Sequence, residues 1–103
     1  MSKRLVFLEK LVADGSTDPM AWYGLAMEYR STERFDDALR TFQTLRSRDP
    51  GYVAMYLMCG EMLAKGGDLA SAREWYTAGV LVARSRGDGH ALGELEAALG
   101  LLE

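Results

Sequence analysis

The stretch "AWYGLAMEYRSTERFDDALRTF", which runs from Ala21 to Phe42, has a counterpart in "MYLMCGEMLAKGGDLASAREWY", which runs from Met55 to Tyr76. The two segments align at an offset of 34 residues, with large residues on large ones and small residues on small ones. Aligned pairs include Trp22 with Tyr56, Ala26 with Gly60, Ala38 with Ala72, and Phe42 with Tyr76. This pattern indicates an internal repeat in which one structural unit occurs twice.

Within each unit the apolar residues recur at spacings of three, four and seven, which is typical of amphipathic helices. The first unit carries two such rows, Trp22, Leu25, Ala26 and Tyr29 and then Phe35, Ala38, Leu39, Phe42 and Leu45, all of which we expect in the core. The breaks between rows hold helix start and stop signals, among them Asp18 before Pro19 and Gly66-Gly67 before Asp68. Each unit is therefore predicted to be a helix–turn–helix.

These residues resemble the tetratricopeptide repeat family, whose signature is Trp, Leu, a small residue, Tyr, Ala, Phe and a closing Pro at fixed spacing. The first unit matches the signature. The second departs from it at five positions: Tyr56, Cys59 and Leu63, which are of compatible size, and Gly79 and Arg84, where the family favours a small apolar residue and proline. Without that proline we expect the last helix of the second unit to continue to about Arg86. The matching positions in the first unit are Trp22, Leu25, Ala26, Tyr29, Ala38, Phe42 and Pro50.

Apolar residues also recur at helical spacing on both sides of the repeats, around Leu5 and Leu8 and from Leu92 to Leu102. Two flanking helices would cover the ends of the repeats and bury a continuous core. We therefore predict an all-α fold of about six helices, arranged as antiparallel helix-hairpin repeats in an α–α superhelix. A single domain is expected over 1–103, with an N-terminal capping helix in 1–18, repeats in 19–52 and 53–86, and a C-terminal capping helix in 87–103.

The composition narrows the class of function. A net charge of −3 and a pI near 5.1 do not provide the dense basic surface that nucleic-acid binding needs. Cys59 is the only cysteine, so the chain can form no internal disulfide, and we expect a reduced, cytoplasmic protein. The apolar run Leu5–Leu8 is too short for a signal peptide or a membrane span, so no membrane partner is expected.

No residue pattern of an enzyme or a cofactor site is present. His90 is the only histidine and is predicted in the first turn of the last helix, while Cys59 aligns with a core leucine. We therefore predict no catalytic residue, no metal site and no cofactor. Trp75 aligns with Thr41, a position that need not lie in the core, so this large aromatic side chain needs cover. We expect the C-terminal helix to supply it, with a subunit interface as the alternative.

The resemblance implies an interaction scaffold in which the first helix of each pair lines a concave groove for a peptide or a partner helix. The alternative is that these groove residues pack against the N-terminal helix or against a second copy of the chain. With a second copy in the groove, the chain would be a self-assembling structural subunit, a homo-oligomer. Polar residues that would clamp a terminal carboxylate are replaced in both units, which disfavours that mode of binding. The groove residues implied are Met20, Tyr23, Met27 and Arg30 in the first unit, and Ala54, Leu57, Glu61 and Lys65 in the second.

Overall fold

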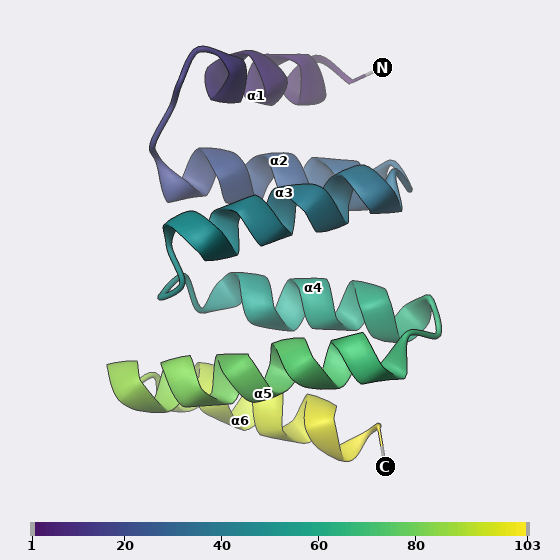
Figure 1. The fold of residues 1–103 in the computed structure, drawn as a ribbon, viewed down its shortest axis with the longest axis vertical. Helices are drawn as coiled ribbons and strands as arrows, with labels where there is room; N and C mark the ends of the chain where they lie inside the picture. The colour runs from purple at the N-terminus through teal and green to yellow at the C-terminus, as the bar shows by residue number, and fades with distance from the viewer. Residues whose placement is uncertain (1, 103) are drawn as a thin grey trace. The chain divides into compact units, whose positions relative to one another are not determined.

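The computed structural model describes residues 2–102 and contains six α-helices in that range, which confirms the predicted all-α helix-hairpin fold (Figure 1). Two compact units make up the chain, one with the residues up to Asp49 and one beginning at Pro50. The first unit holds α1 (Lys3–Ala13), α2 (Pro19–Ser31) and α3 (Phe35–Arg48). The second holds α4 (Ala54–Lys65), α5 (Leu69–Arg86) and α6 (Gly89–Gly100).

In the first unit, α2 and α3 form an antiparallel hairpin and α1 packs on α2. Helix α2 begins as predicted, because the Asp18 carboxylate accepts a hydrogen bond of 2.9 Å from the N–H of Met20 and Pro19 occupies the first turn. Between α2 and α3 the chain turns through Glu33, whose φ of 62° is the left-handed conformation that glycine adopts more easily.

In the second unit, Gly67 takes the equivalent turn with a φ of 89°, and the Asp68 side chain accepts a hydrogen bond from the N–H of Ser71. That bond caps α5. Hydrogen bonding to the Ser71 side chain, and then to its backbone N–H, holds the pKa of Asp68 below its ordinary value. Helix α5 ends at Arg86, as predicted, and Gly87 closes it in the left-handed conformation. Helix α6 packs on α5 and also contacts α4.

The sequence prediction was wrong for one aromatic residue, Phe35, and left the placement of another, Trp75, open. Phe35 is 50% exposed because it is the first residue of α3, beside the turn, and the aligned Leu69 is exposed for the same reason at the start of α5. Trp75 and the aligned Thr41 are both buried, so this position of the repeat belongs to the core. The Trp75 ring packs against Tyr56 of α4, with 5.9 Å between the ring centroids.

Candidate functional site

The residues predicted to line the groove in the first unit lie in one row on α2. Met20 is 69% exposed, while Tyr23, Met27 and Arg30 are partly buried. Helix α1 contacts the neighbouring side of α2, where Arg4 pairs with Glu28 at 3.1 Å. The α2 row therefore lies beside the strip of α2 that α1 occupies.

The second unit contains a pocket of about 270 Å³ between α4 and α6. Two of the predicted groove residues, Ala54 and Leu57, line it, whereas Glu61 and Lys65 lie further along α4. Three exposed polar residues, Asp88, His90 and Glu94, and four more apolar residues complete the lining. The "α4–α6 pocket" is defined here by Val53, Ala54, Leu57, Met58, Asp88, His90, Ala91, Glu94 and Leu95.

The polar residues of the α4–α6 pocket are arranged by the start of α6. Asp88 is the N-cap of this helix, and its carboxylate accepts a hydrogen bond of 3.0 Å from the N–H of Ala91. In the first turns of α6, Nε2 of His90 lies 3.2 Å from Oε1 of Glu94, which is one helical turn further along. The pocket therefore combines an apolar floor with a rim that carries two carboxylates, and this arrangement suits an apolar group with a cation beside it.

Sequence reasoning placed His90 correctly in the first turn of the last helix but did not place α6 at the pocket. The 34-residue offset of the repeats could have predicted that α6 lies at the pocket. Applied once more, it carries Ala54 onto Asp88 and Leu57 onto Ala91, and both of these residues line the pocket. The first helix after the two repeats thus continues their register at these positions.

Residues 2–102 contain neither a candidate metal site nor a candidate membrane-spanning helix. Within this range no three or more His, Cys, Asp or Glu side chains are grouped so that they could hold a metal ion. The helices there include none that is both long enough and apolar enough to cross a membrane.

Comparison with known proteins gives consistent matches over most of the chain. Residues 23–88 match the family model described as "Tetratricopeptide repeat". A TPR repeat-containing protein of Pseudomonas aeruginosa is 30% identical over 96 residues, which span 93% of this chain and 91% of that protein.

Two solved structures are also similar. The solution structure of a protein from Bordetella parapertussis has a TM-score of 0.84 and 31% identity, and the match covers 99% of this chain and 89% of that one. The crystal structure of a tetratricopeptide repeat domain protein from Salinibacter ruber has a TM-score of 0.76 and 32% identity, over 82% of this chain and 94% of the other.

Proposed function

Because this chain belongs to the tetratricopeptide repeat family, whose fold generally mediates protein–protein interactions, we propose that it is an adaptor that binds an apolar peptide segment or partner helix. The proposed contact surfaces are the α2 row in the first unit and the α4–α6 pocket in the second. Burial of the single cysteine, Cys59, supports a reducing cytoplasmic setting, because a buried thiol needs no disulfide partner.

The observation that carries this proposal is the α4–α6 pocket. Its floor includes Leu57, Met58 and Leu95, and methionine adapts its shape to different apolar ligands. The carboxylates of Asp88 and Glu94 favour a ligand that carries lysine or arginine beside its apolar anchor. We therefore propose an apolar segment with an adjacent basic residue as the ligand of this pocket.

A peptide-library selection on the purified chain, followed by fluorescence polarisation with the selected peptides, tests the proposal. Leu57→Asp places a charge on the pocket floor and should weaken binding at least about thirtyfold, because a central anchoring contact commonly contributes 2 kcal/mol or more. Thr77→Asp is the matched control, since it adds the same charge at an exposed position of α5. Selected peptides that bind Leu57→Asp as tightly as wild type, with both variants folded, would exclude this pocket.

A second copy of the chain is the alternative ligand, and the exposed side chains of Val6, Phe7 and Leu81 favour it. Light scattering over a concentration series separates the two functions. A mass that doubles with concentration, and that Leu57→Asp returns to the monomer value, would assign the pocket to self-assembly. A constant monomer mass favours a foreign partner.

A further inference from the structure

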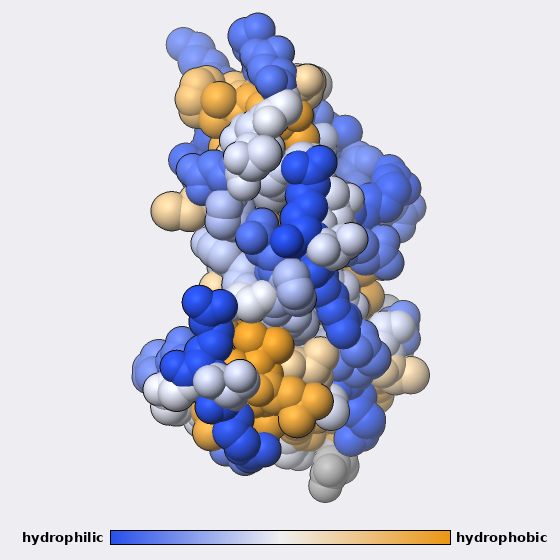
Figure 2. Space-filling view, turned by 60° about the vertical axis from the view of Figure 1, so that its left-hand side comes forward, coloured by the Kyte–Doolittle hydropathy of each residue, from blue (hydrophilic) through white to orange (hydrophobic). Residues whose placement is uncertain are grey.

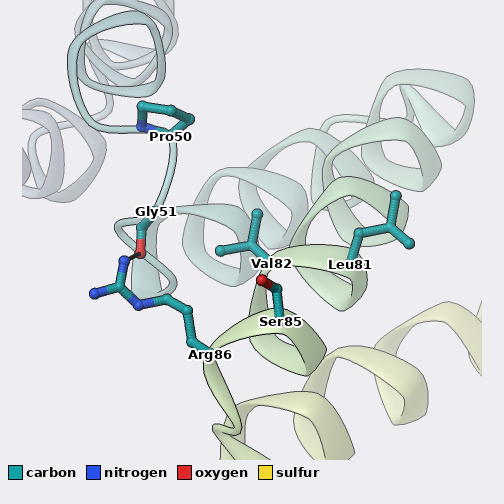
Figure 3. Close-up of a pocket in the computed structure, with 6 residues that line it drawn as sticks. All are labelled: Pro50, Gly51, Leu81, Val82, Ser85 and Arg86. Carbon is teal, nitrogen blue, oxygen red and sulfur yellow. Dashed lines mark hydrogen bonds between the residues drawn. The ribbon is translucent and has the colours of Figure 1, made fainter.

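A second pocket in the second unit, of about 340 Å³, lies between the loop that precedes α4 and the C-terminal turn of α5 (Figure 3). It shares no residue with the α4–α6 pocket. We call it the Arg86 pocket, and its lining residues are Pro50, Gly51, Leu81, Val82, Ser85 and Arg86. Its volume is at the lower end of the range of roughly 300–1,000 Å³ found for ligand sites, so it suits one or two side chains rather than a cofactor.

One wall of the Arg86 pocket is apolar and open to solvent. Leu81 is 64% exposed, and Figure 3 shows it on the far side of the pocket from Arg86, with Val82 between them. Figure 2 shows hydrophobic residues gathered at the height of α4–α6, bordered by hydrophilic ones, on the side where α5 ends. An apolar surface with a polar border is typical of an interaction site.

The opposite wall carries a fixed positive charge. A guanidinium N–H of Arg86 donates a hydrogen bond of 3.1 Å to the carbonyl oxygen of Gly51, which lies 35 residues earlier in the chain. The absence of a side chain on Gly51 makes room for this approach, because a Cβ at position 51 would lie 2.3 Å from an Arg86 guanidinium nitrogen and would displace it. The bond positions the guanidinium at the pocket and leaves its other N–H donors available.

No carboxylate among residues 2–102 neutralises this charge. The Gly51 carbonyl is the one partner that the described part of the chain gives to Arg86. The neighbouring arginine of the same helix turn, Arg84, differs in this respect, because it lies 3.7 Å from the carboxylate of Glu96. Arg86 therefore places a positive charge across the pocket from the apolar wall.

We propose that the Arg86 pocket docks an extended segment of a partner protein in which an aspartate or glutamate lies next to an aliphatic residue. The carboxylate would accept charge-assisted hydrogen bonds from the Arg86 guanidinium, whose planar geometry matches two carboxylate oxygens. The aliphatic side chain would cover Leu81, Val82 and the ring of Pro50. This ligand is opposite in charge to the one proposed for the α4–α6 pocket, so the two sites would bind different segments.

The test is an NMR titration of the ¹⁵N-labelled full chain with three capped tripeptides, Leu-Glu-Leu, Leu-Gln-Leu and Gly-Glu-Gly. The Leu-Glu-Leu peptide should shift the amide signals of Gly51, Val82 and Ser85 and bind more tightly than either of the others. Its affinity should fall as salt is added, because an exposed ion pair is screened. The Leu-Gln-Leu peptide should show no such dependence.

Arg86→Gln should weaken Leu-Glu-Leu binding about threefold to fivefold, the upper range for one solvent-exposed ion pair, and leave Leu-Gln-Leu binding unchanged. Arg84→Gln is the matched control, because it removes an arginine from the same helix turn that already has a carboxylate partner. The unchanged Leu-Gln-Leu affinity also verifies that the apolar wall remains folded in each variant.

Three results would overturn the proposal. The first is equal affinity for the Leu-Glu-Leu and Leu-Gln-Leu peptides, and the second is an equal loss of affinity in Arg84→Gln and Arg86→Gln. The third is an absence of shifts at Gly51 and Ser85, including the case in which the shifted signals fall on the α4–α6 pocket. In each of these cases Arg86 serves only to tie the loop at Gly51 to α5.

Discussion

The ring of Tyr76 lies directly against the backbone of Gly60, so closely that a Cβ on Gly60 would lie 2.3 Å from Cε1 of Tyr76. Both residues are buried, and they join α4 to α5. The 34-residue alignment pairs Gly60 with Ala26 and thereby indicates that a small residue belongs there. The contact explains why the second unit carries glycine, the smallest residue, at this position.

Gly60→Leu should therefore destabilise the protein more than Cys59→Leu. Added side-chain atoms at a close helix contact typically cost about 1–3 kcal/mol, while the site of Cys59 aligns with Leu25 and accepts a leucine in the first unit. Chemical denaturation of both variants measures the difference in the free energy of unfolding. The reverse ranking would mean that the two repeats are aligned incorrectly.

Gly79 and Gly24 provide a matched pair of glycine-to-alanine substitutions inside helices. At Gly79 an added Cβ would lie 2.6 Å from Cβ of Tyr56 and 3.0 Å from a methyl group of Leu95, whereas at Gly24 the nearest atom is a methyl group of Leu8 at 3.5 Å. Alanine is favoured over glycine in a helix by about 1 kcal/mol. Gly24→Ala should thus raise the free energy of unfolding by up to about 1 kcal/mol, and Gly79→Ala should lower it by about 1–3 kcal/mol.

Thermal and denaturant unfolding of the two alanine variants give these values directly. If both substitutions stabilise the chain, the spacing between α5 and its neighbours α4 and α6 is wider than the structure gives. If both destabilise it, the room beside Gly24 is smaller than its 3.5 Å contact indicates.

Tyr29 connects α2 to α1, because its hydroxyl donates a hydrogen bond of 2.5 Å to Oε2 of Glu9. The pKa of Tyr29 is raised to about 12, mainly by burial of the phenol and then by the hydrogen bond to Glu9. The folded state therefore favours the neutral phenol more than the unfolded state does. Its contribution to stability is complete below a pH of about 10, the pKa of an unfolded tyrosine, and is lost as the pH rises from about 10 to about 12.

Comparison of wild type with Tyr29→Phe isolates this effect from the other groups that titrate at high pH. The difference in their free energies of unfolding, measured by denaturation at several values from about pH 8 to about pH 11, should decrease above about pH 10. A difference that stays constant over this range would show that the phenol ionises equally in both states.

We expect Tyr23 to contribute to binding, because it lies at the centre of the α2 row, between Met20 and Met27 on the same face of the helix. For a ligand or self-association constant measured on the wild type, Tyr23→Ala should weaken binding at least about thirtyfold, because a central aromatic anchor commonly contributes 2 kcal/mol or more. Melting curves of the variant serve as the folding control. Unchanged binding by a folded Tyr23→Ala protein would restrict the site to the α4–α6 pocket.

The secondary structure was predictable because its signals are local. Helical spacing, the caps at Asp18 and Asp68 and the left-handed turn at Gly67 each depend on residues within about one helical turn of one another. The absence of proline at position 84 predicted the extension of α5 to Arg86 on the same basis. The sequence alone therefore determined the helices, their hairpin pairing and the membership of a repeat family.

The exposure of particular residues depended on which element lies over them, and helical spacing alone does not specify this. Phe35 has core spacing but begins a helix at an uncovered turn, while Trp75 lies in the core because Tyr56 of α4 packs against it. Similarly, the α4–α6 pocket and the bond from Arg86 to Gly51 join residues more than thirty positions apart. Only the tertiary structure brought these groups together, because such contacts arise from the packing of whole helices and not from the preferences of neighbouring residues.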